Sequence, residues 1–512
     1  MAKARSKQWI EREKLRERGQ FWTPDWVAEA MVGYVAADSD LVFDPAFGAG
    51  AFASAGRRLS ATLGRTIRFA GCELDPAALR EAREAGIAAR DLRRVRIADF
   101  LALKALPKGA RIVANPPYIR HHRLGPALKA RLRRIAIENV GVALDGRTGL
   151  HVFFLIHALS LLEKGGSLAF IVPADVCEGV YARALWQWIG SRFRLDAVVT
   201  FSADATPFPG VDTNPIVLMI RKLPPSETFL WARIERAGGE DFLSWVRRGL
   251  PECSTGAMRA EQRSVRVGLS AGVSRRVQMA EAPEFRLGDF ARVMRGVATG
   301  ANEFFLLTSE KAREVGIPPE LLVRAIGRTR DVPGDCVDES LLDELDRAGR
   351  PTYLLALDGK REEAFPPSVR RYLARGVQLG LPERPLIAQR RPWYKMERRV
   401  APRFLFSYLG RRNSRFIRND AGVWPLTGFL CVYPRSSAPD TVRALEELLN
   451  HPDVLRGLET VAKSYGSGAL KVEPRALERL PIPRRLVDDV GLEVTLASDP
   501  AAAEADQMAL AI

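Results

Sequence analysis

Short apolar segments alternate with helical segments from about residue 20 to residue 222, and this alternation constrains the fold more than any other feature. Helical stretches lie at 76–85 and 150–162, between apolar segments that end in turn residues. Strands that alternate with helices form a parallel sheet with helices on both faces. We therefore predict an α/β fold with a doubly wound parallel sheet, whose strands are 41–43, 67–71, 95–97, 111–114, 167–172, 195–201 and 216–220.

The alternation stops at about residue 225, which divides the chain into segments of different character. We predict an α/β domain at 21–225, preceded by a basic segment at 1–20. A short strand and a connector are expected at 226–285, and a domain of mixed α+β content at 286–486. The remaining residues, 487–512, are acidic and rich in alanine, and we expect them to be disordered.

The chain carries a large positive charge, +16 at pH 7, which favours a polyanionic partner over a small-molecule substrate alone. Its five cysteines lie far apart and form no CxxC pair, so we expect no disulfide framework, no metal site and a reducing, cytoplasmic setting. The N-terminus lacks the apolar core of a signal peptide. The most apolar stretch, 150–162, is too short to span a bilayer, so we expect no membrane partner.

A glycine-containing loop, Asp-Pro-Ala-Phe-Gly-Ala-Gly at 44–50, follows the first predicted strand. Glycines let the backbone turn tightly and approach a ligand closely, and open α/β sheets bind ligands at the carboxyl ends of their strands. The loop lacks the third glycine of a dinucleotide fingerprint. We take Asp44, Pro45, Gly48 and Gly50 as candidate ligand contacts.

Acidic residues also end the second and third predicted strands. Glu73 is placed to accept hydrogen bonds from ribose hydroxyls. Asp99 is placed to accept from an adenine amine, with Phe100 packing on the ring. Thr23 precedes Pro24 at the start of a helix, where we expect it to be the N-cap and the helix N-terminus to hold a ligand carboxylate.

The motif Asn115-Pro116-Pro117-Tyr118 directly follows the fourth predicted strand. Two consecutive prolines fix the backbone, so the neighbouring carbonyl groups have fixed directions. The Asn115 side-chain oxygen and the Pro116 carbonyl would each accept one N–H of an exocyclic amine on an aromatic base. This arrangement would direct the amine's lone pair at an electrophile by positioning and electrostatics alone.

Two aromatic residues are candidates to contact an unstacked base. Tyr118 offers a face beside the amine acceptors, and Phe208 lies in a proline-rich loop before the last predicted strand. The alternative for Phe208 is packing into the edge of the sheet. His151, near the start of the helix predicted at 150–162, has no role that the sequence assigns.

Taken in this order, the motifs resemble those of the N6-adenine DNA methyltransferases of restriction–modification systems, in the group whose target-recognition domain follows the cofactor motifs. The resemblance continues at 295–305 and 465–474, within the second domain. It implies a Rossmann-like methyltransferase domain that uses S-adenosylmethionine, followed by a DNA-binding domain. The cofactor contacts that it implies are Thr23, Asp44, Pro45, Gly48, Gly50, Glu73, Asp99, Phe100 and Asn115. The residues that it implies at the target adenine are Asn115, Pro116, Pro117, Tyr118 and Phe208.

Positive charge gathers in two segments, which we predict to bind double-stranded DNA. Six basic residues and no acidic residue lie between Ile119 and Ile137. Ten basic residues and one acidic residue lie at 390–418, interleaved with aromatic side chains. The candidate DNA contacts are Arg120, Arg123, Arg390, Arg391, Arg398, Arg399, Arg411 and Arg412.

Other functions stay open at this point. The Asn-Pro-Pro-Tyr motif also occurs in methyltransferases that act on ribosomal RNA or on protein glutamine. A non-catalytic DNA-binding specificity subunit with a decayed methyltransferase domain is a further alternative. Because only about twenty residues precede the first motif, we expect any DNA cleavage to belong to a separately encoded restriction endonuclease.

Overall fold

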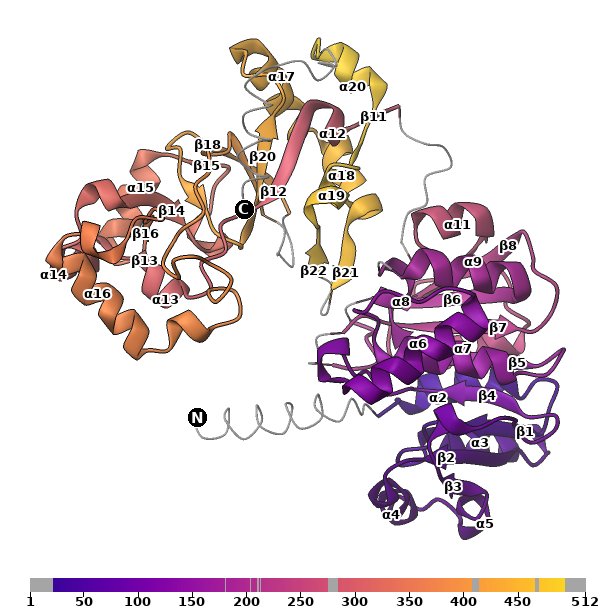
Figure 1. Ribbon diagram of the computed structural model, residues 1–512. Coiled ribbons are helices and arrows are strands. Elements are labelled where there is room, and N and C mark those ends of the chain that lie inside the picture. Colours follow the sequence, from indigo (N-terminus) through magenta and orange to yellow (C-terminus); the bar gives the residue numbers. More distant parts are fainter. Residues whose placement is uncertain are drawn as a thin grey trace. The chain divides into compact units, whose positions relative to one another are not determined.

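The computed structural model divides the chain into two compact units (Figure 1). The first unit contains residues 1–280 and 465–468, and the second contains 281–464 and 469–512. The residues that the structure describes are 22–179, 181–202, 204–209, 211, 213–274, 284–407, 414–465 and 469–492. The predicted basic segment at 1–20, Arg411, Arg412 and the predicted tail beyond residue 492 lie outside the described residues.

The described part of the first unit is built on one ten-stranded sheet, with the strand order β3-β2-β1-β4-β5-β7-β6-β8-β10-β9. The strands are β1 (Leu41–Asp44), β2 (Arg68–Glu73), β3 (Val95–Ile97), β4 (Arg111–Ala114), β5 (Ser167–Pro173), β6 (Arg194–Phe201), β7 (Pro215–Arg221), β8 (Thr228–Ile234), β9 (Cys253–Ser254) and β10 (Met258–Ser264). Each strand predicted from the sequence is present. The strand order reverses between β1 and β4, which places a ligand crevice at their carboxyl ends.

The sheet is mixed, whereas the sequence predicted a parallel one. Strands β1 to β5 pair in parallel, but β7 is antiparallel to both of its neighbours, β5 and β6. The physical reason lies in the connection between β6 and β7, whose described residues contain no helix. A parallel pair needs a crossover connection, usually a helix, whereas an antiparallel pair needs only a loop.

The segment predicted as a connector, 226–285, instead continues this sheet over much of its length. Strand β8 pairs in parallel with β6, and β10 pairs antiparallel with β8. In β10, buried Met258 and Ala260 alternate with exposed Arg259. This strand lies near the sheet edge and has one solvated face, so its sequence is too polar to be recognised as a strand.

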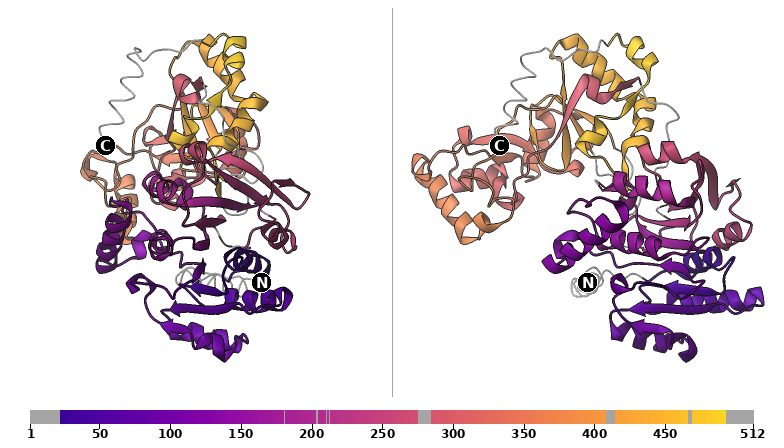
Figure 2. Two further views of the ribbon diagram at one scale, coloured as in Figure 1. Left: turned by 90° about the vertical axis from the view of Figure 1, so that its right-hand side faces the viewer. Right: turned by 45° about the vertical axis from the view of Figure 1, so that its right-hand side comes forward.

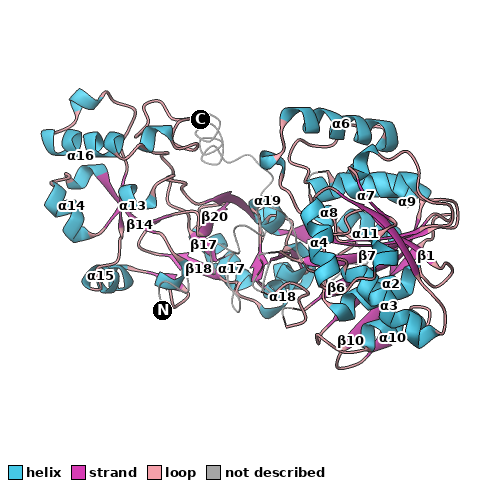
Figure 3. Cartoon of the chain, turned by 90° about the horizontal axis from the view of Figure 1, so that it is seen from below, coloured by secondary structure: helices cyan, strands magenta, loops and turns pink. Residues whose placement is uncertain are grey.

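Helices cover both faces of the sheet (Figure 3). One face carries α2 (Asp25–Val35), α3 (Ala51–Leu63) and α10 (Asp241–Arg247), and the other carries α6 (Pro126–Val140), α7 (Leu150–Leu161) and α9 (Ala182–Arg192). Alternating side chains of the central strands pack on the two layers, which confirms the predicted doubly wound α/β fold. The shorter helices of this unit are α4 (Pro76–Glu84), α5 (Ala89–Leu92), η1 (Phe100–Ala102), η2 (His121–Arg123), α8 (Asp175–Glu178) and α11 (Val265–Ala271).

The second unit combines strands and helices (Figure 2), which confirms the predicted mixed α+β content. One sheet has the order β12-β20-β17-β18-β15 and another has the order β13-β16-β14-β19. The strands are β11 (Phe285–Arg286), β12 (Ala291–Arg295), β13 (Leu306–Leu307), β14 (Leu322–Ile326), β15 (Cys336–Val337), β16 (Tyr353–Leu355), β17 (Phe404–Ser407), β18 (Phe416–Asn419), β19 (Trp424–Pro425), β20 (Phe429–Pro434), β21 (Lys463–Tyr465), β22 (Ala469–Lys471) and β23 (Pro481–Ile482).

The helices of the second unit pack on these strands and reach into the predicted tail. They are α12 (Leu287–Phe290), α13 (Asn302–Phe305), α14 (Ser309–Val315), η3 (Pro319–Leu321), η4 (Thr329–Asp331), α15 (Glu339–Arg347), η5 (Glu362–Ala364), α16 (Pro367–Gln378), η6 (Leu381–Glu383), α17 (Pro439–Leu449), α18 (Pro452–Val461), α19 (Pro474–Leu477) and α20 (Arg484–Asp489). The tail predicted to be disordered from residue 487 therefore begins inside α20, where Val487 is buried. None of the helices described in either unit is both long and apolar enough to cross a membrane.

Candidate active site

The carboxyl ends of the central strands bring the predicted motifs of the first unit together. Strand β1 pairs in parallel with β2 and with β4, so Asp44, Glu73 and Asn115 emerge at the same edge of the sheet. Strand β3 continues this edge on the far side of β2 and leads to Asp99. The residues predicted from separate motifs thus line one crevice edge, as expected for an open α/β sheet.

The glycine loop between β1 and α3 takes a backbone conformation that requires glycine. Gly48 and Gly50 have φ angles of 52° and 83°, in the left-handed region that side chains disfavour. A Cβ atom at Gly50 would lie 2.8 Å from Cγ1 of Ile87. Within the loop, the Pro45 carbonyl accepts from the Cys72 thiol. The loop is thereby held close to the end of β2.

Asp44 is a buried carboxylate with an elevated pKa. Its side chain is 1% exposed, and its Oδ1 atom accepts from the backbone N–H of Ala46 at 3.0 Å. Burial raises the pKa of Asp44 to about 8, since the charged form loses its hydration. Among the described residues, no cationic side chain lies within ion-pair distance of it. A buried carboxylate in this state fits a cationic ligand group such as an ammonium.

Glu73 holds the glycine loop through both of its carboxylate oxygens. Oε2 accepts from the Gly48 N–H at 2.8 Å, and Oε1 accepts from the N–H groups of Leu74 and Asp75 at 2.8 and 3.0 Å. A carboxylate has about four acceptor positions, so these bonds leave capacity for ligand hydroxyls. The half-buried Glu73 therefore orders the loop and faces the crevice.

Asp99 makes an ion pair that the sequence did not indicate. Its Oδ1 atom accepts from the Leu101 N–H at 2.9 Å and caps η1, while Oδ2 lies 2.7 Å from Nη1 of Arg131 in α6. Arg131 belongs to the basic segment that the sequence assigned to DNA. The neighbouring Phe100 is 2% exposed and packs on Phe154, with ring centroids 5.3 Å apart, so its side chain lies mainly in the core.

Thr23 and Asn115 are joined directly. The Asn115 side-chain amide donates from Nδ2 to the Thr23 hydroxyl at 3.1 Å, although the two residues are 92 positions apart. The prediction that Thr23 caps the helix was wrong, because the N-cap of α2 is Pro24 and no side chain caps it. The Thr23 hydroxyl is turned toward Asn115 instead, and the residue is 2% exposed. Since the NH₂ group of the amide faces Thr23, its carbonyl oxygen points away from Thr23.

Tyr118 makes contacts with several neighbouring groups at the carboxyl ends of the central strands. Its hydroxyl donates to the Ile171 carbonyl of β5 at 3.0 Å, and burial raises the pKa of this phenol well above its usual value. Phe208 meets the Tyr118 ring edge-to-face, with centroids 6.4 Å apart, and is itself 5% exposed in the core. Phe208 therefore packs in the core of the first unit and also contacts Tyr118 of the Asn-Pro-Pro-Tyr motif. Pro116 is buried and Pro117 is half-buried beside them.

A histidine–aspartate pair lies on another side of the Tyr118 ring. His151 packs against this ring with centroids 5.9 Å apart, and its Nε2 atom lies 3.1 Å from Oδ1 of Asp175. Asp175 follows β5 and was not predicted. The rule that polar residues at strand ends form sites would have found it, because it lies two residues after Pro173 ends the strand.

The predicted DNA contacts fall into two groups. In the first unit, Arg120 and Arg123 are exposed at η2, which follows the Asn-Pro-Pro-Tyr motif. In the second unit, Arg391 and Arg398 are exposed. The remaining described candidates, Arg390 and Arg399, donate hydrogen bonds to backbone carbonyls of the second unit.

Arg390 and Arg399 support the backbone of the second unit. Arg390 donates to the Ala298 carbonyl at 2.5 Å, and burial lowers the pKa of its guanidinium. Arg399 pairs with Glu397 at 2.5 Å and donates to the Arg295 carbonyl. Both arginines therefore hold the segment at 295–305, the segment that carries part of the family resemblance.

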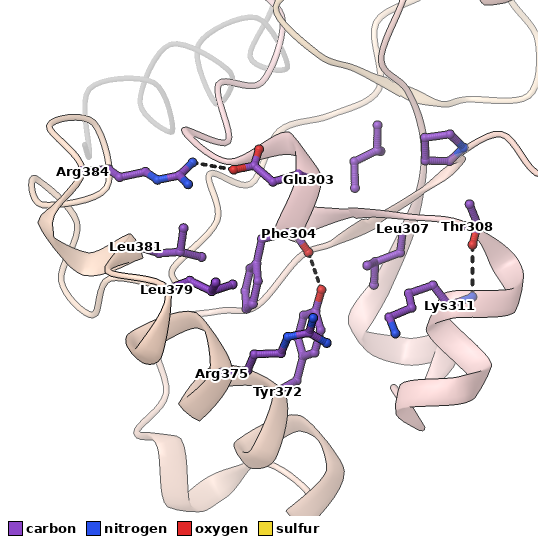
Figure 4. Close-up of a pocket in the computed structure, with 12 residues that line it drawn as sticks. Glu303, Phe304, Leu307, Thr308, Lys311, Tyr372, Arg375, Leu379, Leu381 and Arg384 are labelled. Atoms are coloured by element: carbon purple, nitrogen blue, oxygen red, sulfur yellow. Dashed lines mark hydrogen bonds and ion pairs between the residues drawn. The ribbon is translucent and has the colours of Figure 1, made fainter.

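The second unit also contains a pocket of about 460 Å³ between α13, α14 and α16 (Figure 4). Several of its polar side chains bond to other groups of the protein. Arg384 lies 2.6 Å from Glu303, and the Tyr372 hydroxyl donates to the Phe304 carbonyl at 2.8 Å (Figure 4). These pairs favour a role in packing. Within the described ranges of both units, no cluster of His, Cys, Asp and Glu side chains is suited to bind a metal ion.

Comparison with known protein families matches a segment of the first unit and most of the second unit. Residues 110–208 match the family model of the Eco57I restriction-modification methylase, and this range includes Asn115, Tyr118 and His151. Residues 273–503 match the model of the C-terminal domain of the type II methyltransferase M.Eco57I. The first match therefore lies within the first compact unit, and the second match lies mostly within the second unit.

Curated relatives match over nearly the full length of the chain. The type II methyltransferase M.AccI of Acinetobacter calcoaceticus is 23% identical over 482 residues, which cover 92% of this chain and 86% of M.AccI. The type II methyltransferase M.XamI of Xanthomonas campestris pv. amaranthicola is 26% identical over 477 residues, which cover 91% of this chain and 85% of M.XamI. Both matches therefore extend over both compact units of this chain.

A solved structure shares the fold of both parts. The type IIL restriction-modification enzyme MmeI, solved in complex with DNA, superposes with a TM-score of 0.54 over 99% of this chain and 77% of that chain. The sequence identity is 15%, so this likeness concerns the fold alone.

Proposed function

Because this chain is a methyltransferase of the restriction–modification type, by its family matches and its curated relatives, we propose that it methylates the N6 amine of an adenine everted from duplex DNA. The methyl donor in this proposal is S-adenosylmethionine. The observation that carries the proposal is the hydrogen bond between Thr23 and Asn115 at the carboxyl end of β4.

This hydrogen bond bears on the reaction because it orients the Asn115 amide. An exocyclic amine on a purine is a poor nucleophile, since its lone pair is delocalised into the ring. Two acceptors, the Asn115 oxygen and the Pro116 carbonyl, would bind the two N–H groups of N6 and favour a tetrahedral amine. With the amide NH₂ facing Thr23, the group directed away from Thr23 is the Asn115 oxygen, which is the acceptor that the amine requires.

The strand-end carboxylates fit the polar groups of S-adenosylmethionine. The cofactor supplies an electrophilic methyl group on a sulfonium. Asp44 would bind its ammonium group, because the ligand's positive charge would favour the ionised form that burial alone disfavours. Glu73 would accept from the ribose hydroxyls, and Asp99 would accept from the adenine amine while Arg131 holds its side chain in place.

The aromatic residues beside Asn115 support an everted base as the substrate. An enzyme that modifies a base within a duplex must remove the base from the stack and replace the lost contacts. Stacking of a base on an aromatic side chain contributes about 1–3 kcal/mol. Tyr118, packed edge-to-face on Phe208, would provide this surface.

Exposed arginines on both units support duplex DNA as the partner. Arg120 and Arg123 lie immediately after the motif, where phosphates that flank an everted base would pass. Arg391 and Arg398 would contact DNA from the second unit. MmeI, which shares this fold, was solved in complex with DNA.

Radiolabelled methyl transfer tests the proposal directly. The purified chain is incubated with labelled S-adenosylmethionine and, in parallel, with plasmid DNA, ribosomal RNA or a glutamine-containing protein substrate. We expect label in DNA alone, recovered after digestion as N6-methyl-2′-deoxyadenosine. Label in either other substrate would reject the proposal. No label, together with no binding of S-adenosylmethionine, would favour a non-catalytic specificity subunit.

The variant Asn115→Ala supplies the mechanistic control. We expect it to abolish transfer, because one of the two acceptors for the amine is lost, while DNA binding measured by gel shift stays near the wild-type value. Loss of transfer and of DNA binding together would mean that Asn115 is required for the fold. Sequencing of the methylated plasmid then maps the recognition site for the experiments that follow.

A further inference from the structure

His151 is a buried side chain that the proposed reaction does not use. It lies at the second position of α7, is 4% exposed, and takes no part in binding the amine or the cofactor in the scheme above. Its Nδ1 atom is buried and has no hydrogen-bond partner among the described residues. An unsatisfied buried nitrogen costs stability, so a histidine placed only to fill the core is a poor choice at this position.

The structure makes specific room for the imidazole. The residue before α7 is Gly149, and a Cβ atom there would lie 2.7 Å from Cε1 and 2.9 Å from Nδ1 of His151. The other ring nitrogen, Nε2, lies 3.1 Å from Oδ1 of Asp175. His151 lowers the pKa of Asp175 against the effect of burial, so the partner is a carboxylate. The imidazole is therefore fixed in one orientation.

The Tyr118 ring needs a neighbour with a fixed orientation, because its own hydrogen bond does not fix the plane of the ring. Its hydroxyl donates to the Ile171 carbonyl. The hydroxyl oxygen lies on the axis about which the ring turns, so this hydrogen bond fixes the axis but not the plane of the ring. The plane is set by the two rings that meet Tyr118 edge-to-face, Phe208 at 74° and His151 at 71°.

We infer that His151, anchored by Asp175, is a positioning residue that fixes the plane of the Tyr118 ring on which the everted base stacks. Phe208 belongs to a loop, whereas His151 belongs to a helix that is buried over most of its length, so His151 is the more rigid support. The inference rests on the proposed function, since it requires a base at Tyr118.

A probe base reports the stacking directly. A duplex that carries the mapped recognition site is prepared with 2-aminopurine, which is fluorescent and quenched by stacking, in place of the target adenine. We expect His151→Ala to raise the long-lifetime, unstacked fraction of the bound probe by about two- to tenfold. We expect kcat to fall by a similar factor, while KM for DNA and for S-adenosylmethionine stays within about twofold of the wild-type value.

Two conservative variants separate the ring from its hydrogen bond. His151→Phe keeps an aromatic ring against Tyr118 and should restore most of the stacked fraction. His151→Asn keeps a donor for Asp175 without a ring and should not. If His151→Ala fails to fold, the comparison of these two variants still tests the inference, because both replacement side chains fill more of the space of the imidazole than alanine does.

His157 on the same helix is a matched control. It too is a buried histidine, with Nε2 3.1 Å from the Leu103 carbonyl and an edge-to-face contact with Phe100 at 5.0 Å. We expect His157→Ala to lower the melting temperature while the lifetime distribution of the bound probe stays at the wild-type value.

Three results would overturn the inference in a wild-type protein that methylates DNA. They are unchanged lifetimes and kcat in His151→Ala, better rescue by Asn than by Phe, or equal lifetime changes in His151→Ala and His157→Ala. A wild-type protein that methylates no DNA would instead overturn the proposed function and the inference together.

Discussion

At the scale of single residues, the hydrogen bond between Thr23 and Asn115 leads us to expect that Thr23 couples the proposed cofactor to the nucleophile. A hydroxyl has one donor hydrogen and two acceptor lone pairs. The Thr23 oxygen accepts from Asn115, so its hydrogen remains to be donated to an acceptor such as the cofactor carboxylate. The same side chain would then contact the cofactor and orient the amide that holds the target amine.

Substitution of Thr23 tests this coupling. We expect Thr23→Val to lower kcat by about ten- to a hundredfold, because loss of one hydrogen bond in a buried site lets the Asn115 amide rotate. Thr23→Ser keeps the hydroxyl and should retain most of the activity. Steady-state kinetics with both substrates varied would show the effect. A change in KM for S-adenosylmethionine alone, with kcat intact, would limit Thr23 to cofactor binding.

The buried carboxylate of Asp44 predicts a pH dependence of cofactor binding. Its pKa is about 8 in the absence of ligand, so the carboxyl group is mostly protonated below pH 8. An ammonium ligand requires the charged form, and binding below pH 8 must therefore release a proton. We expect the affinity for S-adenosylmethionine to rise about tenfold per pH unit from pH 6 to pH 8, and to level off or fall above, where the ligand's own amine loses its proton.

Isothermal titration calorimetry in buffers of different ionisation enthalpy measures the affinity and the released proton together. Asp44→Asn is the control, and its residual binding should be weak and independent of pH over this range. The variant should also stabilise the ligand-free protein at pH 8. The pKa of this buried acid is raised from 3.8 to about 8, so its ionisation destabilises the fold progressively as the pH rises between these two values. A flat profile in the wild type would contradict an Asp44–ammonium contact.

The sequence located strand-end residues well and contacts between distant segments poorly. Asp44, Glu73, Asp99 and Asn115 could be placed because each ends a predicted strand or lies within two residues of its end. The pair of His151 and Asp175 could not be predicted, because their contact requires α7 to pack beside the end of β5. Local sequence does not encode such packing.

At the scale of elements, the same distinction holds. The central strands were predictable because they are buried on both faces and are continuously apolar. Strand β10 was missed because its exposed face is charged, and the direction of β7 was missed because it depends on a connection without a helix. Strand pairing is decided by the whole sheet, which the sequence of one segment does not reveal.

Helix α6 has one arginine paired within the first unit and two that are exposed, and we expect them to have different roles. Arg131 pairs with Asp99, whereas Arg133 and Arg134 are exposed. We expect the double variant Arg133→Ala/Arg134→Ala to weaken DNA binding and to reduce the slope of log K against log salt by about 2, one unit per lost phosphate contact. Affinity for S-adenosylmethionine should be unchanged.

The matched variant Arg131→Ala should show the reverse pattern. Loss of the guanidinium removes the partner of Asp99, so cofactor affinity should fall while the salt dependence of DNA binding changes little. Fluorescence anisotropy over a salt series, with calorimetry for the cofactor, distinguishes the two. Equal loss of DNA affinity in both variants would show that α6 binds DNA through all its arginines.

At the scale of the whole molecule, the two units have separate hydrophobic cores. The core of the first unit lies on both faces of its ten-stranded sheet, and those of the second unit lie around its own sheets and helices. The proposed cofactor contacts, from Thr23 to Asn115, all belong to the first unit. This arrangement separates chemistry from the second unit, to which we assign recognition of DNA.

Separate cores and a cofactor site in one unit predict the thermal unfolding of the full chain. Differential scanning calorimetry should show two transitions, since each unit has its own core and can unfold independently of the other. S-adenosylmethionine at about 100 times its Kd stabilises the state that binds it by about 2.7 kcal/mol, which corresponds to a shift on the order of 5 °C. We expect only one transition to move, and none to move in Asp44→Asn. A single transition that shifts as a whole would mean that the two units unfold as one cooperative body, and that their stability depends on contacts between them.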